Sequence, residues 1–119
     1  MYYYKVEILR VVDGDTVDVR VDLGFKVWHK CRVRMIGINA PESRTRDLKE
    51  KAKGLAAKEW LKLILNDEVH EIQMQSQGKG KYGRVLGVFY KDLGNKKPLN
   101  INEEMVKQGH AVVYNGGKR

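Results

Sequence analysis

Residues 11–24 read VVDGDTVDVRVDLG, and this stretch decides the fold. Its second half alternates valine with aspartate and arginine, which is the period of a strand with one buried face. Asp-Gly-Asp precedes this strand and Leu-Gly follows it, and both are turn sequences. We therefore expect three strands joined by short hairpin turns, at residues 6–12, 17–21 and 25–38.

The third of these strands separates apolar from cationic residues. Cys31, Val33 and Met35 fall on one face at period two, whereas Arg32 and Arg34 fall on the other. Arg34 is therefore expected on the face away from the core, where a ligand can reach it. A proline at position 41 ends the extended run.

The remaining elements complete a barrel. Residues 48–65 have a helical composition, and strands are expected at residues 69–74 and 84–90, on either side of a polar loop at residues 75–80. A short helix is expected at residues 100–109. This order is that of a five-stranded OB-fold barrel, a β-barrel with helices (α+β), and we expect one domain over residues 1–119. The apolar residues expected on the buried face of the long helix are Ala52, Ala56, Trp60, Leu63 and Ile64.

The composition limits the class of protein. A chain of 119 residues suits one core, and no apolar run reaches the roughly 20 residues of a membrane span. A single cysteine, Cys31, excludes an internal disulfide and a thiolate zinc site. The N-terminus enters strand-like sequence without a signal peptide, so we expect a cytoplasmic protein. We also expect a monomer that does not contact membranes.

The net charge of +8 at pH 7 favours a polyanionic partner, and nucleic acid is the usual one. Many of the cations have a simpler explanation, because those of the long helix are expected to form a solvated face. Charge therefore favours a nucleic-acid partner without establishing one. The residues of the solvated face are Arg46, Lys49, Lys51, Lys53, Lys58 and Lys62.

Three separate segments carry the chemistry that hydrolysis of a phosphodiester needs. Residues 13–16 read DGDT, residues 34–42 read RMIGINAPE and residues 81–84 read KYGR. The arginines of the last two keep their charge at neutral pH, and the oxygen atoms of the first two suit a hard divalent cation. The sequence therefore predicts a nuclease.

These motifs, in this order and on these elements, resemble those of the staphylococcal nuclease (thermonuclease) family of OB-fold phosphodiesterases. The resemblance runs from about Val6 to Tyr114 and includes a fourth motif at residues 101–111. It implies a metal-dependent nuclease that hydrolyses DNA or RNA with little sequence preference. The alternative is a non-catalytic nucleic-acid-binding OB module, because barrels of this family also occur with decayed sites.

The resemblance implies a role for each matching position. Arg34 and Arg84 would bind the scissile phosphate, and Glu42 would be the general base for the attacking water. Lys81 and Tyr82 would hold a terminal phosphate and stack near a base or sugar. A second stacking platform would come from Tyr114.

The implied metal is calcium. Its ligands would be Asp15, Asn39 and the backbone oxygen of Ala40, with Asp13 behind them. Asn39 stands where the family's type member has an aspartate, so the site keeps an oxygen but loses one negative charge. We therefore expect weaker calcium binding, or use of another divalent ion. Ala40 replaces a threonine, which matters less because the ligand is the backbone oxygen.

Structural explanations stay open for the same residues. Asp13 and Asp15 could be turn formers only, and Glu42 could cap the following helix. Arg34 could pair with a carboxylate across the sheet, and Arg84 could be a solvated charge. The family's type member also continues into a further helix, so this chain is either a minimal version of the fold or a trimmed one.

Overall fold

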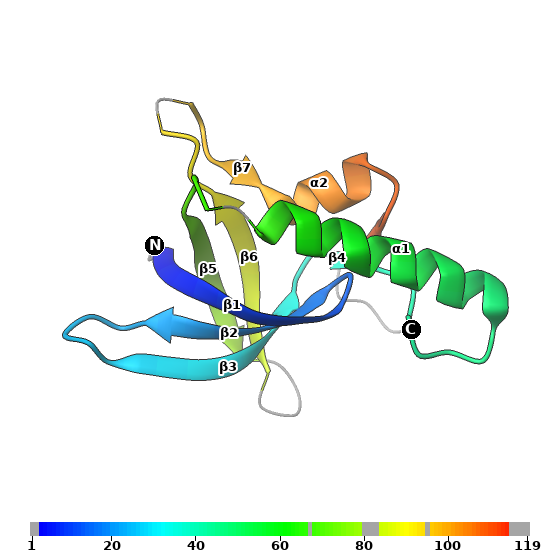
Figure 1. Ribbon diagram of the computed structural model, residues 1–119, viewed down its shortest axis with the longest axis horizontal. Coiled ribbons are helices and arrows are strands. Elements are labelled where there is room, and N and C mark those ends of the chain that lie inside the picture. The colour runs from blue at the N-terminus through cyan, green and yellow to red at the C-terminus, as the bar shows by residue number, and fades with distance from the viewer. Residues whose placement is uncertain (1–2, 67, 80–83, 95, 115–119) are drawn as a thin grey trace.

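Five strands close into a barrel in the computed structural model, which describes residues 3–66, 68–79, 84–94 and 96–114 (Figure 1). The strands run in the order β3-β2-β1-β5-β6, and β3 then pairs with β6 in parallel to close the barrel. This arrangement confirms the predicted OB-fold class. The strand bounds are Tyr3–Asp13 (β1), Thr16–Asp22 (β2), Trp28–Met35 (β3), Ile72–Lys79 (β5) and Val85–Lys91 (β6).

Two helices and three short strands complete the described part of the chain. Helix α1 (Leu48–Leu65) packs along β1, and α2 (Ile101–Lys107) packs against β6 beside it (Figure 1). Strand β4 (Ile38–Asn39) pairs with β8 (Val112–Val113), and β7 (Leu99–Asn100) extends the edge at β6. Neither helix is long and apolar enough to cross a membrane.

The valine alternation of β2 fills the barrel as predicted. Val17 and Val19 are fully buried, and they face Val33 and Met35 of β3 in the same core. Cys31 lies at the margin of this core and is half-buried. Burial raises the pKa of the Cys31 thiol, and the charge of Asp18 raises it further, so the thiol is protonated at neutral pH.

Helix α1 has the predicted bounds, but its predicted buried face was only partly right: Trp60 and Ile64 pack against the core, whereas the other three residues do not. Leu63 is 73% exposed, and Ala52 and Ala56 are exposed as well. Small residues explain the difference, because the helix approaches the barrel most closely where its side chains are smallest. Asp47 caps its N-terminus by accepting from the backbone N–H groups of Lys49 and Glu50. The residues that α1 buries are Gly54, Ala57, Leu61 and Leu65.

Strand β5 lies later in the chain than its apolar residues suggested. Val69 precedes the strand and is 85% exposed, whereas the predicted polar loop at residues 75–80 continues the strand through Lys79. Pairing with β6 supplies backbone partners that composition cannot reveal, and a bulge between Ser76 and Gly78 accommodates the bend.

A buried amide joins α2 to the barrel. Oδ1 of Asn102 accepts from the backbone N–H of Phe89 at 3.1 Å. Its Nδ2 donates to the carbonyl oxygens of Ile36 at 2.9 Å and Gly87 at 3.2 Å. One side chain thus connects β6 with the turn between β3 and β4.

Replacement of this amide should destabilise the protein. Asn102→Ala would remove hydrogen bonds to the N–H of Phe89 and the carbonyl of Ile36, while the carbonyl of Gly87 would still accept from the N–H of Ile36. We expect a loss of about 3 kcal/mol in the free energy of unfolding. Urea unfolding would measure the loss. Gln108→Ala, which removes an exposed 3.4 Å contact with Glu104, should stay within about 0.5 kcal/mol of the parent. Equal effects of the two substitutions would contradict the structural role of Asn102.

Candidate active site

The two aspartates of the β1–β2 turn hold the ends of the segment 40–43. Oδ2 of Asp15 accepts from the backbone N–H of Ala40 at 2.9 Å, and its Oδ1 accepts from the Thr16 hydroxyl at 3.0 Å. Oδ1 of Asp13 accepts from both the hydroxyl and the backbone N–H of Ser43. Glu42 lies between these two attachments, and its own side chain is exposed.

Two glycines allow the backbone to approach from the other side. A Cβ on Gly54 of α1 would lie 2.3 Å from the carbonyl oxygen of Glu42 and 2.7 Å from the nitrogen of Ser43. A Cβ on Gly14 would lie 2.8 Å from Cβ of Ala57 and 2.9 Å from Cβ of Ala40. Real Cβ atoms do not make such contacts, so both positions require glycine. The segment that carries Glu42 is therefore held between the turn and the helix.

Arg34 is fixed at the same end of the barrel. Its Nη1 donates to the carbonyl oxygen of Met35 at 2.6 Å and its Nη2 to that of Ile38 at 3.0 Å. Nη1 also lies 3.5 Å from Oδ2 of Asp15, and the Arg34 side chain is 15% exposed. The guanidinium is thus oriented by three oxygen atoms at the end of the barrel that carries Asp15.

Asn39 offers an oxygen that the fold does not use. Its Oδ1 is buried and has no hydrogen-bond partner among the described residues. Such a group is costly unless something outside the protein pairs with it, and a divalent cation is one candidate. Ala40 is the next residue of the same segment, and its backbone N–H donates to Asp15 of the β1–β2 turn. The described residues hold no cluster of three or more His, Cys, Asp or Glu suited to a metal. The predicted ligands are one carboxylate, one amide oxygen and one backbone carbonyl, so they would not form a cluster of that type.

A mostly apolar pocket of about 430 Å³ opens beside Arg34. Tyr114 lies in its wall, held by a 2.9 Å hydrogen bond from its backbone N–H to the carbonyl of Gly37. Arg84 immediately precedes β6, and Leu86 of β6 pairs with Arg34, so the structure brings Arg84 to the beginning of the strand beside that of Arg34. Lys81 and Tyr82 lie outside the described residues. The pocket is lined by Arg34, Met35, Ile36, Gly37, Ile38, Leu86 and Tyr114.

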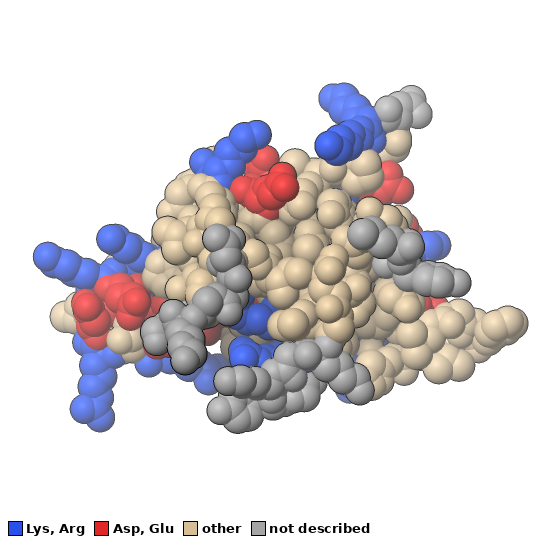
Figure 2. All heavy atoms as spheres, turned by 180° about the vertical axis from the view of Figure 1, so that it is seen from behind, with Lys and Arg blue, Asp and Glu red and all other residues tan. Residues whose placement is uncertain are grey.

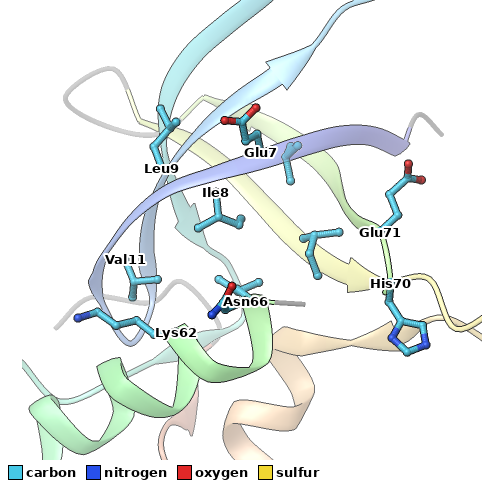
Figure 3. A pocket seen from close by; sticks show the side chains of 11 residues that line it. Glu7, Ile8, Leu9, Val11, Lys62, Asn66, His70 and Glu71 are labelled. Atoms are coloured by element: carbon cyan, nitrogen blue, oxygen red, sulfur yellow. The ribbon is translucent and has the colours of Figure 1, made fainter. Parts of the chain in front are cut away.

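A second cavity, of about 590 Å³, lies away from these residues, between β1 and the end of α1 (Figure 3). Its rim carries Glu7 and Glu71, which pair with Arg20 and Lys5 respectively. None of Asp15, Arg34 and Asn39 lines this cavity, so it is not the candidate active site.

Sequence reasoning missed two residues that shape the site. Gly54 carried a signal, because a glycine inside a helix is costly unless something approaches its backbone. Ser43 carried none, since its bond to Asp13 spans 30 positions and depends on the closed barrel.

The family model described as "Staphylococcal nuclease homologue" matches residues 32–119. The chain belongs to the staphylococcal nuclease family. The matched range includes Arg34, Glu42 and Arg84, whereas the Asp-Gly-Asp turn precedes it.

Individual relatives extend the staphylococcal nuclease match to more than nine-tenths of the chain. "Micrococcal nuclease" of Shigella flexneri is 35% identical over 115 residues, which is 93% of this chain and 59% of the relative. "Thermonuclease" of Staphylococcus hyicus is 32% identical over 108 residues, 91% of this chain and 57% of the relative. "Endonuclease YhcR" of Bacillus subtilis is 30% identical over 118 residues, 93% of this chain and 9% of the relative. The chain thus spans less than two thirds of the length of each of these relatives.

The approach of α1 to Glu42 is testable by adding one methyl group. Gly54→Ala places a Cβ against the peptide between Glu42 and Ser43, and overpacking of this kind costs about 2 kcal/mol. Urea unfolding of the variant would measure the cost. Helix propensity alone predicts the opposite sign, a gain of up to about 1 kcal/mol, so stabilisation would contradict the close contact. Lys53→Ala, at the exposed neighbouring position, should change stability by less than about 0.5 kcal/mol.

Proposed function

We propose that this protein is a divalent-metal-dependent nuclease that hydrolyses DNA or RNA with little sequence preference. The observation that carries the proposal is the convergence of Arg34, Asp15 and the unpartnered oxygen of Asn39 at one end of the barrel. Relatives named as nucleases, including one from Shigella flexneri and one from Staphylococcus hyicus, support the same reaction.

Arg34 and Arg84 are proposed to bind the scissile phosphate. A guanidinium can donate to two phosphate oxygens at once, and its positive charge offsets the charge that develops as phosphorus becomes five-coordinate. Arg34 is already oriented by the carbonyl oxygens of Met35 and Ile38, so its reorganisation during the reaction is small. Arg34 lies on β3, and Arg84 lies immediately before the neighbouring β6, which supports a common phosphate between them.

Glu42 is proposed as the general base. It takes a proton from water while the water oxygen attacks phosphorus, and the bond from phosphorus to the 5′-oxygen breaks. The leaving 5′-oxygen takes a proton from solvent water, so the products are a 3′-phosphate and a 5′-hydroxyl. The two attachments of its segment, at Ala40 and Ser43, support this role, because a base must be held within hydrogen-bond reach of the attacking water.

Calcium, or another divalent ion, fits the donors on this chain. Asp15, the amide oxygen of Asn39 and the carbonyl oxygen of Ala40 would hold it, and Asp13 would support them through Ser43. A bound ion supplies positive charge that polarises a phosphate oxygen and the attacking water. Asn39 contributes no negative charge, so we infer that calcium binds weakly.

The pocket beside Arg34 is proposed to receive a base of the substrate. Its wall is mostly apolar, and Tyr114 offers an aromatic surface for stacking. Lys81 and Tyr82 are proposed to hold a neighbouring phosphate and sugar. A base in this pocket must be unpaired, which favours single-stranded or melted nucleic acid.

A non-catalytic nucleic-acid-binding module is the second candidate. Asn39 favours it, because loss of an acidic metal ligand is one way in which a nuclease site decays. Arg34, Glu42 and Arg84 favour the enzyme, since binding alone does not need this group.

Cleavage of labelled single-stranded DNA tests the proposal directly. We expect cleavage with calcium, magnesium or manganese and none with EDTA. Arg34→Ala should lower kcat by about 10²–10³-fold, because it removes a preoriented donor to the phosphate. Arg46→Ala, an exposed arginine before α1, should leave the rate unchanged. Binding without cleavage under every ion would establish the second candidate instead.

The inferred weakness of calcium binding is testable through stability. Asn39→Asp restores a negative charge and should tighten calcium binding on the order of tenfold, since calcium affinity follows ligand charge. The increase in melting temperature on adding calcium measures this affinity without any assay of activity. Asn66→Asp introduces the same charge at the exposed end of α1 and should leave the calcium-induced increase unchanged. Equal increases in both variants would remove Asn39 from the metal site.

A further inference from the structure

The hairpin of β2 and β3 projects beyond the barrel as an arm, defined here as residues 22–32 (Figure 1). From behind, the arm is the extension at the lower right, and uncharged residues cover its visible face (Figure 2). Four large apolar side chains of the arm are at least 43% exposed: Leu23, Phe25, Val27 and Trp28.

The turn at the end of the arm is well defined. The backbone N–H of Leu23 donates to the carbonyl of Val27, and that of Val27 donates to the carbonyl of Gly24, both at 2.9 Å. Oδ1 of Asp22 accepts from the N–H of Gly24 at 2.8 Å. The exposed side chains therefore project from an ordered turn.

Phe25 has no structural reason to occupy this turn. Its φ of 53° is left-handed, a conformation in which Cβ crowds the carbonyl oxygen and which glycine or asparagine adopts more easily. The ring is fully exposed, so packing offsets none of this strain. A strained backbone and a fully exposed aromatic ring at the same position indicate a contact with another molecule.

The arm carries positive charge along its return strand. The arm begins with one acid, Asp22, after which residues 23–41 contain four Lys or Arg and no Asp or Glu. Two of the four are engaged within the protein, Arg32 by Asp18 and Arg34 by Asp15. The hydrogen bond from Arg32 also lowers the pKa of Asp18, as expected for a firm pair. Lys26 and Lys30 make no ion pair within the described residues, and both are exposed.

Strand β3 connects this charge to the candidate active site. Trp28, Lys30 and Arg34 fall on one face of the strand at period two. The indole of Trp28 is held by the guanidinium of Arg20, 4.6 Å above the ring centre. At roughly 3.3 Å per residue, Trp28 lies about 20 Å from Arg34 along the strand.

We propose that the arm is a second binding site for the polynucleotide substrate, on which Phe25 stacks against an unpaired base while Lys26 and Lys30 contact phosphates. Aromatic rings between cations are the combination that binds single strands without sequence preference. The inference rests on the proposed function and extends it, because it makes the preferred substrate a strand of several nucleotides.

The same observations disfavour a second copy of this chain as the occupant. Within the part of the chain that the structure describes, residues 28–32 of β3 pair with β2 alone, which leaves one backbone edge open to another strand. Pairing of two such edges would bring Lys30 and the other cations of two strands together, and like charges across strands repel. A polyanion meets no such repulsion.

Binding of a labelled 30-nucleotide single strand, in EDTA so that no cleavage occurs, tests the arm. Phe25→Gly should weaken binding about tenfold, the loss expected for one stacked base. It also relieves the left-handed strain, so its melting temperature should not fall, which separates lost binding from lost folding. Lys30→Gln should reduce the slope of log affinity against log salt by about 1. The matched control is Leu63→Ser with Lys53→Gln, an exposed apolar residue and an exposed cation of α1, and it should bind as the parent does.

Cleavage separates this inference from the proposed function. A dinucleotide cannot span the distance of about 20 Å between the site and Trp28. The Phe25→Gly variant should therefore cleave a dinucleotide as fast as the parent does, while losing activity on the 30-mer.

Unchanged affinity of Phe25→Gly for the 30-mer would overturn the inference even if the parent is a nuclease. If the parent cleaves neither substrate but Phe25→Gly binds the 30-mer weakly, the proposed function fails and the binding arm stands. Phe25-dependent flotation with phosphatidylserine vesicles, at unchanged DNA affinity, would assign the arm to membranes and overturn the inference.

Discussion

The attachment of residues 40–43 to the β1–β2 turn is the constraint on which the rest of the site depends. Asp15 holds the N–H of Ala40, Asp13 holds Ser43, and Gly54 lets α1 close over the peptide between them. Because each carboxylate bonds backbone or hydroxyl groups, the position of Glu42 follows from the barrel and not from its own side chain. A hairpin turn thereby becomes part of the candidate active site.

The same region balances charge across a short distance. Arg34 lies against Asp15 and two carbonyl oxygens, while the neighbouring Asn39 contributes a neutral oxygen. An aspartate at position 39 would add a second negative charge close to this arginine. Under the proposed function, the asparagine would leave the guanidinium less neutralised and more attractive to a phosphate, at the expense of cation affinity.

The sequence was sufficient for the barrel because its strands carry a strict alternation, as at Val17, Val19 and Val21. The sequence was not sufficient to predict the buried face of α1 or the extent of β5, because small or polar residues determine both. The buried face of α1 is set by Gly54 and Ala57, which contribute little hydrophobicity, and β5 continues through polar residues that β6 pairs. Motifs indicated the arginines and the acidic turn, but no local pattern could reveal that Ser43 reaches Asp13.

The parallel seam between β3 and β6 has a consequence for folding kinetics. It joins only Val33–Met35 to Val85–Gly87, segments separated by about half of the chain, and contacts between distant segments form slowly. Arg34 lies on one side of this seam and Arg84 at the beginning of the other. The pair of arginines is therefore assembled by one of the most non-local steps of folding, and local opening of the seam would separate them while the β1–β2–β3 meander stays intact.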